Sequence, residues 1–377
     1  MKITAIDHFV CQAGGRNWVF VKVSTDEGVY GVGEGSLYGK EHTMRSAIEE
    51  LRRDIVGKDP RRVEYLWQEM YRHAFWRGGP VLCSAISGVE MALWDIKGKL
   101  LGVPVYELLG GHVRDEVRFY CNLGDGTPES LIERGKKWIA KGIDAFKIYP
   151  FPAVNYVDSM RPIREAEEKI ASFREFAGNE VDIMIDFHGR LSPSMAILAE
   201  EVMRPYEPLF IEEPCLPENV EAMAKIARHA KTPIATGERL YTRWGLREII
   251  ERQIASVVQP DLCHCGGIME AKKIAAMAET YYMATAPHNP YGPVATAACV
   301  QVDFCIPNFL IQEHIFDDMP WRDLVYTPVI ELENGRLKRP TLPGLGIDLN
   351  LEEIAKHPYE ERDQVKWYHP DGAIADM

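Results

Sequence analysis

The 377-residue sequence lacks the features that mark several broad classes of protein. Its formal net charge of −13 leaves no excess of basic residues, which argues against nucleic acid or an anionic membrane as a main partner. No segment reaches the roughly 18 uninterrupted apolar residues of a membrane span, and the start, MKITAIDHFV, lacks the two regions of a signal peptide. We therefore expect a cytoplasmic protein, in which an anionic substrate would need a local cation.

Paired cysteine spacing is also missing. The eight cysteines are scattered along the chain, which is typical of reduced thiols. One close pair, Cys263 and Cys265, flanks His264, but the sequence has no second Cys/His pair to complete a ligand set. This spacing disfavours a zinc site.

No Gly-x-Gly-x-x-Gly follows the first strand of the middle region, as a dinucleotide-binding sheet would require. From residue 117 onward, strand-like and helical stretches alternate instead. Helical periods include 128–141, 163–177, 194–204, 218–230, 244–252 and 268–280, and the candidate strands are 117–121, 144–149, 182–187, 208–212, 233–236, 256–260, 282–286 and 309–313. Eight strands joined by crossovers favour a closed parallel barrel over an open sheet of about five or six strands.

The first third of the chain has a different pattern. Residues 3–12 and 18–24 alternate apolar and polar side chains, and a turn precedes 29–33, which predicts an antiparallel meander. Helical periodicity follows at 41–56, 61–73 and 80–100. This part therefore predicts a compact α+β domain.

Polar side chains stand at the C-terminal ends of seven consecutive candidate strands, where α/β barrels carry their function. A single acid there is more often a helix N-cap, but seven strands in a row make capping an improbable explanation. The residues are Lys147 and Tyr149, Asp186 and His188, Glu212, Glu238, Asp261, His288, and Glu313.

Three of these acids are evenly spaced. Asp186 and Glu212 are 26 residues apart, as are Glu212 and Glu238, which is roughly the length of one strand, one helix and two loops. Carboxylates are hard oxygen donors that suit Mg²⁺, and without a cation their mutual repulsion would raise their pKa values. We predict one Mg²⁺ per active site.

Two histidines flank this expected metal site. His188 shares a strand face with Asp186, and His288 follows strand seven, where Asp261 could orient its ring as a general base. Either histidine alone could be structural, but an acid partner and a nearby metal weaken that interpretation. A metal and a base suggest proton abstraction next to a carboxylate, and His188 could then protonate a departing hydroxyl. The predicted reaction is elimination of water from a 2,3-dihydroxy acid.

Two glycine-rich loops of the first third, 13–18 and 75–80, carry tryptophan and arginine. Such loops could form a mobile lid over an anionic ligand. Two ordinary turns with surface arginines explain the same residues.

Several motifs of the chain resemble the enolase superfamily in its mandelate racemase-like branch. They are MKITAI, ALWDIKGKLLGVPVYELLGG, IEEP, GER, QPDLCHCGGI, APHNPYGP and PGLGIDL, spread over nearly the whole length. The resemblance implies an α/β fold: a (β/α)₇β TIM-type barrel over 113–320, with an α+β capping domain built from 1–112 and 321–377. It also implies the metal ligands Asp186, Glu212 and Glu238 and an Asp261–His288 dyad.

Within that branch the chain resembles the D-galactonate dehydratases, through FWRGGP at 75–80, DFHGR at 186–190 and APH at 286–288. This resemblance implies a sugar-acid substrate, His288 as the base at C2 and His188 as the acid on the 3-hydroxyl. The product would be a 2-keto-3-deoxy acid. The side chains expected to line the substrate pocket are Glu313, Asn17, Trp76, Arg77, Lys147, Tyr149 and Arg190.

One departure concerns the end of the second barrel strand. Racemases and several dehydratases of the branch carry Lys-x-Lys there, whereas this chain has Lys147 and Tyr149. A tyrosine with an ordinary pKa near 10 is a poor base at neutral pH, which favours one-base elimination over racemisation.

Other functions stay open at this point. Mannonate dehydratases are similar at 15–17 and 306–313, but they carry a long insertion for which the segment 150–162 is too short. The alternatives are a dehydratase of another aldonate such as mannonate, or an epimerase or cycloisomerase acting on a hydroxy acid or lactone. A non-enzymatic barrel would predict loss of a ligand or of the base, and none is lost. We also expect a homo-oligomer.

Overall fold

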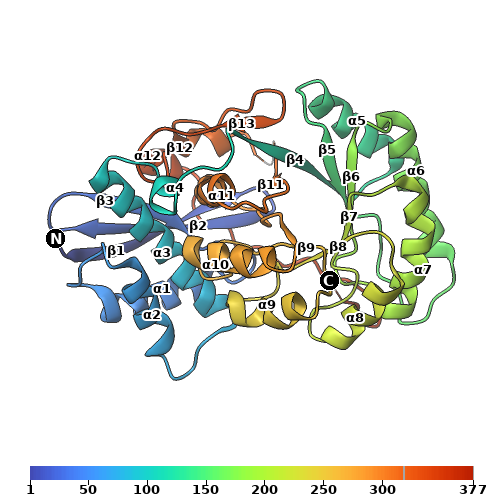
Figure 1. Ribbon diagram of the computed structural model, residues 1–377, viewed down its shortest axis with the longest axis horizontal. Helices are drawn as coiled ribbons and strands as arrows, with labels where there is room; N and C mark the ends of the chain where they lie inside the picture. The colour runs from blue at the N-terminus through green and yellow to red at the C-terminus, as the bar shows by residue number, and fades with distance from the viewer. Residues whose placement is uncertain (317–318, 377) are drawn as a thin grey trace.

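Parallel strands form a barrel in the middle of the chain (Figure 1). The computed structural model describes residues 1–316 and 319–376. Within these residues, eight barrel strands pair in the order β10-β9-β8-β7-β6-β5-β4-β11, and a parallel bridge from Thr285 to Phe309 closes the ring. In chain order they are β4 (Glu116–Gly124), β5 (Ala145–Ile148), β6 (Asp182–Asp186), β7 (Phe210–Glu212), β8 (Ile234–Thr236), β9 (Val257–Val258), β10 (Ala284–Thr285) and β11 (Gln312–His314).

Helices connect successive strands of this ring. They are α5 (Pro128–Ile139), α6 (Arg161–Ala177), α7 (Pro193–Met203), α8 (Val220–His229), α9 (Thr242–Glu251), α10 (Ile268–Glu279) and α11 (Pro293–Cys305), with a short 3₁₀ turn at Arg204–Tyr206. The predicted (β/α)₇β TIM-type barrel is therefore confirmed.

The period of two along each strand determines which side chains face the barrel axis. One residue from each strand, or directly next to it, forms the central apolar layer: Tyr120, Ala145, Met184, Phe210, Ala235, Val257, Ala286 and Ile311. The positions two residues further on face the same way, at the C-terminal mouth of the barrel. They hold Asn122, Lys147, Asp186, Glu212, Gly237, Gln259, His288 and Glu313. The apolar layer thus supports a polar one directly above it.

The N-terminal part is an antiparallel meander covered by helices, as predicted. The strands are β1 (Ile3–Ala13), β2 (Arg16–Thr25) and β3 (Tyr30–Glu34), paired in that order. The helices are α1 (Glu41–Ile55), α2 (Val63–Arg72), α3 (Gly79–Leu101) and α4 (Val105–Leu108). Helix α3 lies so close to β3 that a Cβ at Gly33 would stand 1.9 Å from the carbonyl oxygen of Gly88. Only glycine permits this approach.

Two glutamates of this N-terminal part bind the first turns of barrel helices. Glu90 on α3 accepts hydrogen bonds from the backbone N–H groups of Ile268 (2.8 Å) and Met269 (2.9 Å) at the start of α10. Glu34 accepts from Gly292 (2.8 Å) and Ala295 (2.9 Å) at the start of α11. Carboxylates satisfy the free N–H groups at helix N-termini and complement the helix dipole. These contacts fix the loops that follow β9 and β10.

The C-terminal segment contacts both parts of the molecule. Strands β12 (Tyr326–Thr327) and β14 (Asp348–Leu349) pair with each other near a 3₁₀ turn at Arg322–Leu324, and helix α12 (Leu351–Ile354) follows. Leu345 donates to Asp95 on α3, whereas β13 (Arg336–Lys338) pairs with barrel strand β4. The boundaries at 112 and 320 stay a prediction, and residues 317, 318 and 377 of the predicted ranges lie outside the described residues.

Across the described part of the chain, no helix combines the length and apolarity required to cross a bilayer.

Candidate active site

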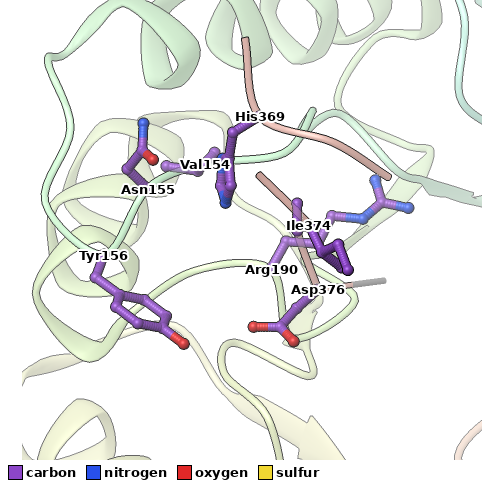
Figure 2. Close-up of a pocket in the computed structure, with 8 residues that line it drawn as sticks. Val154, Asn155, Tyr156, Arg190, His369, Ile374 and Asp376 are labelled. Carbon is purple, nitrogen blue, oxygen red and sulfur yellow. The ribbon is translucent and has the colours of Figure 1, made fainter. Parts of the chain in front are cut away.

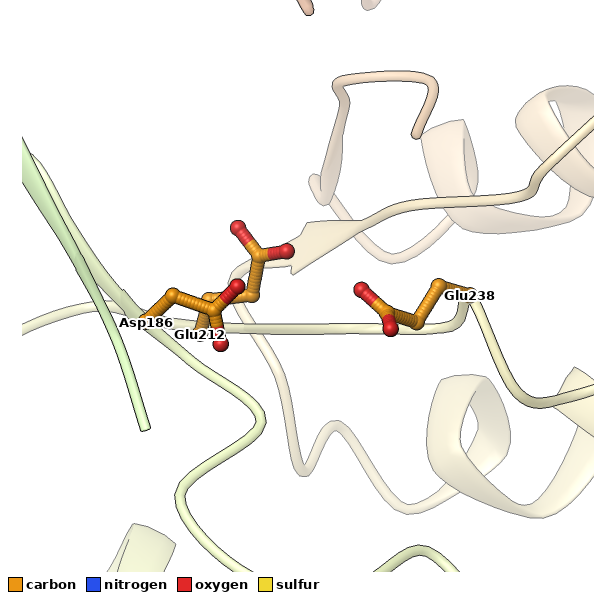
Figure 3. A group of neighbouring side chains, drawn as sticks. All are labelled: Asp186, Glu212 and Glu238. Atoms are coloured by element: carbon orange, nitrogen blue, oxygen red, sulfur yellow. The ribbon is translucent and has the colours of Figure 1, made fainter. Parts of the chain in front are cut away.

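Three carboxylates converge at the barrel mouth. Asp186 and Glu212 end β6 and β7, and Glu238 stands two residues after β8. Their ligand atoms lie within 4.8 Å of one another, and Figure 3 shows the three side chains directed toward a common point. One oxygen of each, Asp186 Oδ2, Glu212 Oε2 and Glu238 Oε2, is buried without a hydrogen-bond partner. Buried oxygens of this kind are costly unless a cation binds them, so these residues fit a divalent metal ion.

Lys147 supplies positive charge to the same site. Its Nζ lies 2.8 Å from Glu212 Oε1, 2.8 Å from Glu313 Oε1 and 3.6 Å from Asp186 Oδ2, and the side chain is fully buried. Burial and the neighbouring Asp186 charge nevertheless raise the pKa of Glu212 well above its usual range, although Lys147 opposes the shift. One lysine does not compensate all the acids around it, which again favours a bound cation.

His288 and Asp261 form the predicted pair. His288 Nδ1 lies 2.7 Å from Asp261 Oδ2, and the other Asp261 oxygen accepts from the backbone N–H of Cys263 at 2.7 Å. The remaining ring nitrogen, Nε2, lies 3.4 Å from Glu238 Oε2 and 3.8 Å from Glu313 Oε2. Burial lowers the pKa of His288, but the charges of Glu238 and Glu313 and the bond to Asp261 outweigh burial and raise it to about 10.

His188 contacts a different member of the cluster. Its Nε2 lies 3.2 Å from Asp186 Oδ2, and its ring packs against Tyr149 at 4.2 Å between centroids. The backbone here is left-handed, with φ of 51°, and the His188 N–H donates to Asp186 Oδ1 at 2.8 Å. The two histidines thus approach one carboxylate cluster through different acids, Asp186 and Glu238.

Tyr149 is buried beside Lys147 and His188. Its hydroxyl accepts a hydrogen bond from Asn122 Nδ2, which also lies 3.1 Å from Glu313 Oε1. Burial raises the pKa of Tyr149 well above its usual range. The side chain therefore stays a neutral phenol at physiological pH.

Asn122 and Gln259 belong to this site but were not predicted. Both follow an apolar-layer residue by two positions, so the strand period could have identified them. The side-chain amide of Gln259 is buried with no hydrogen-bond partner on either atom. It therefore offers a free donor and a free acceptor at the C-terminal mouth of the barrel, where the carboxylates lie.

The predicted substrate-pocket residues fall into two groups. Lys147, Tyr149 and Glu313 lie in the network of the carboxylates, and Arg190 Nη2 lies 3.2 Å from His188 Nδ1. The structure does not bring the other three, Asn17, Trp76 and Arg77, into this network. Their role in substrate binding stays a prediction.

The loop of residues 75–80 and Asn17 have other surroundings. Trp76 is 82% exposed and Arg77 lies 5.7 Å from the ring of Tyr71. The amide of Asn17 donates to the carbonyl of Glu360 at 3.0 Å and accepts from its N–H at 3.1 Å. Asn17 thus anchors the C-terminal segment.

The Cys263-His264-Cys265 segment is buried beneath the N-terminal part. His264 Nδ1 lies 2.7 Å from Ser84 Oγ on α3, and Nε2 lies 2.9 Å from the hydroxyl of Tyr291. Both ring nitrogens are therefore occupied by hydroxyl groups.

Family models match both parts of the chain. Residues 9–110 match the model described as mandelate racemase / muconate lactonizing enzyme, N-terminal domain, and residues 130–354 match the model described as enolase C-terminal domain-like. The chain belongs to the mandelate racemase/muconate lactonizing enzyme family. The predicted membership of the enolase superfamily is thereby confirmed.

Similar proteins cover the whole chain. It is 45% identical to a D-galactonate dehydratase of Ralstonia pickettii (strain 12J), over 95% of this chain and 96% of that protein. It is 40% identical to a D-galactonate dehydratase of Pectobacterium atrosepticum, over 100% of both chains. The predicted similarity to D-galactonate dehydratases is confirmed, and it supports a hydro-lyase.

Solved structures give the same fold. A member of the enolase superfamily from Salmonella Typhimurium superposes with a TM-score of 0.90 at 32% identity, covering 95% of this chain and 98% of that one. The structure of an enolase from Agrobacterium radiobacter with bound Na and L-malate superposes with a TM-score of 0.94 at 29% identity, covering 100% of both.

A divalent cation should change the titration of His288. The pKa of about 10 in the metal-free protein depends on the negative charges of Glu238 and Glu313. A cation on Glu238 offsets one of these charges, so the imidazolium is less stabilised and the pKa should fall. Histidine ¹⁵N NMR titrations with and without Mg²⁺, assigned with His288→Asn, measure this shift. In Glu238→Gln the shift should largely disappear, and identical midpoints with and without the cation in the unmodified protein would contradict the assignment.

Proposed function

We propose that the protein is a Mg²⁺-dependent acid-sugar dehydratase that converts a D-galactonate-like substrate into a 2-keto-3-deoxy acid. The observation that carries the proposal is the approach of two histidines to one carboxylate cluster through different acids, Asp186 and Glu238. An elimination needs such an arrangement, since one group removes a proton and a second protonates the leaving group. The D-galactonate dehydratases similar to this chain support the choice of substrate.

Asp186, Glu212 and Glu238 would hold the metal ion. One buried oxygen of each makes no hydrogen bond, and carboxylate oxygens are hard donors suited to Mg²⁺. When bound, the cation supplies the positive charge that offsets the negative charge developing on the substrate carboxylate. Lys147 and Glu313 lie beside it, where the ammonium group can attract the anionic substrate.

His288 is the general base of this proposal. Asp261 accepts a hydrogen bond from Nδ1–H and so leaves the lone pair of Nε2 directed toward the carboxylates. Nε2 takes the C2 proton of the sugar acid. The negative charge of Asp261 then stabilises the imidazolium that forms.

His188 is the general acid. Its Nε2 protonates the 3-hydroxyl as the C3–O bond breaks, so the oxygen leaves as water, while Arg190 donates a hydrogen bond to Nδ1. The C2 proton and the C3 oxygen are both lost, and the resulting enol takes up a proton at C3 to give the 2-keto-3-deoxy acid. Buried, neutral Tyr149 stands where the second lysine of Lys-x-Lys would supply another base, which disfavours racemisation. We retain a cytoplasmic homo-oligomer as a prediction.

A substrate screen tests the function. Purified protein with Mg²⁺ is incubated with hexonates and pentonates, mannonate included, and the 2-keto acid is measured as its semicarbazone. We expect turnover of D-galactonate or an aldonate close to it, with none in His288→Asn. Turnover of a lactone or of a muconate, and of no aldonate, would overturn the proposal.

The two histidine roles are separable by isotope exchange. In deuterated water, His288→Asn should abolish exchange of the C2 proton, because the base is missing. His188→Asn should block dehydration by roughly 10²–10⁴-fold, the usual contribution of a general acid, while C2 exchange continues. Proton NMR follows the exchange. Exchange lost in His188→Asn but retained in His288→Asn would reverse the two roles.

A further inference from the structure

The C-terminal tail, defined here as residues 355–376, crosses from the N-terminal meander to the barrel. The carbonyl of His357 accepts from the backbone N–H of Gln12 at 2.8 Å, and Glu360 pairs through its backbone with Asn17. Gln364 Nε2 then donates to the carbonyl of Tyr38 at 3.2 Å. These contacts direct the following residues toward the loop after β6.

Trp367 contacts Arg190, which lies in that loop. The guanidinium Cζ lies 4.0 Å from the centroid of the Trp367 ring. Nη1 donates to the carbonyl of Phe151 at 2.6 Å, and Nη2 lies 3.2 Å from Nδ1 of His188. Arg190 is only 9% exposed. Trp367 is therefore one of the few groups that hold this buried cation.

No ion pair of Arg190 occurs among the residues that the structure describes, and its Nε is buried without a hydrogen-bond partner. A buried cation without a carboxylate needs another source of stabilisation. Among aromatic side chains, tryptophan makes the strongest cation–π interaction. This interaction strengthens when the cation and the ring are shielded from water. The Trp367 ring thus adds to the negative charges of Asp186 and Asp125, which act on the Arg190 guanidinium without forming an ion pair.

The position of Arg190 determines the orientation of His188. A guanidinium can only donate, so Nδ1 of His188 accepts, and its Nε2 is turned toward Asp186 Oδ2 at 3.2 Å. The ring has Tyr149 on one face. Loss of Arg190 would leave Nδ1 without this partner and the ring free to rotate.

The end of the tail forms a turn beside Arg190. His369 donates to the carbonyl of Ala373 at 2.8 Å, and Ala375 donates to that of Trp367 at 3.0 Å. Figure 2 shows residues of this turn, of the segment 154–156 and Arg190 around one pocket. Together they line a cavity of about 240 Å³, whose polar walls include Asn155, Arg190, His369 and Asp376.

We propose that the C-terminal tail is part of the active site, with Trp367 as a positioning residue that holds Arg190 and, through it, His188. This chain of contacts ends at His188, the proposed acid. Trp367 therefore acts on protonation of the leaving hydroxyl. His288 lies at the Glu238 side of the cluster and has no contact in this chain of residues. The proposal rests on the proposed function, in which His188 is the acid.

Trp367→Ala tests the positioning role directly. We expect a roughly 10–30-fold fall in kcat for dehydration, the size of a shielded cation–π contact, with C2 exchange in deuterated water unchanged. Trp367→Phe retains an aromatic face and should restore most of the rate. Tyr368→Ala is the matched control, because Tyr368 neighbours Trp367 but is exposed and makes no contact with Arg190 in the described structure. Equal losses of exchange and dehydration, or equal effects of Trp367→Ala and Tyr368→Ala, would overturn the proposal.

A double-mutant cycle separates this chain of contacts from general damage to the tail. If Trp367 acts through Arg190, then Trp367→Ala should have little further effect in the Arg190→Ala protein, since coupled residues are not additive. Independent, multiplicative effects of the two changes on kcat would contradict the proposal.

A readout without turnover distinguishes failure here from failure of the proposed function. Histidine ¹⁵N NMR, assigned with His188→Asn, reports whether Nδ1 of His188 is a hydrogen-bond acceptor. The acceptor signal should be present in the unmodified protein and in Trp367→Phe, and should be lost in Trp367→Ala. Its persistence in Trp367→Ala would overturn the positioning role even if no sugar acid proved to be a substrate.

Discussion

The repulsion among buried carboxylates is the constraint on which the rest of the site depends. Asp186, Glu212, Glu238 and Glu313 share the barrel mouth, and Lys147 is the ammonium group among them. Burial of like charges disfavours their ionised forms, as the raised pKa of Glu212 shows. A bound cation would reduce this repulsion. Because the same carboxylates raise the pKa of His288, the cation would also lower that pKa toward a value suited to a base.

The N-terminal part and the C-terminal tail hold the two histidines from outside the barrel. Glu34 and Glu90 bind the first turns of α11 and α10, and those helices follow the loops that carry His288 and Asp261. On the other side, Trp367 contacts Arg190 beside His188. In the proposed mechanism the barrel would therefore supply the metal ligands, whereas segments distant in sequence would hold the two histidines that transfer protons.

Much of this site could be predicted from strand ends alone. Asp186 and Glu212 end buried strands at one repeat spacing, and the parallel topology brings them together. The pairing of Asp261 with His288 also follows from adjacent strands. The same reasoning could have identified Asn122 and Gln259, because each lies two residues beyond the apolar layer. They were not predicted because an amide is a less obvious catalytic candidate than an acid.

Other features depend on contacts that no local pattern encodes. Barrel strands β7 to β11 and most of the C-terminal segment lie between Arg190 and Trp367 in sequence, so neither stretch predicts the other. Asn17 belongs to a segment whose composition suggests a ligand-binding loop, yet it lies in strand β2, and both ends of its amide bind the backbone of Glu360. Exposed loop residues such as Trp76 have no packing that would fix their position, so composition alone could not place them at the site.

The central claim is that the three carboxylates form one cation site. Calorimetric titration of Mg²⁺ into chelator-treated protein tests it most directly, with Glu212→Gln and Glu238→Gln in parallel. We expect one Mg²⁺ per chain in the unmodified protein and severely weakened binding in both variants. Undiminished binding in both variants, or no binding to the unmodified protein, would contradict it.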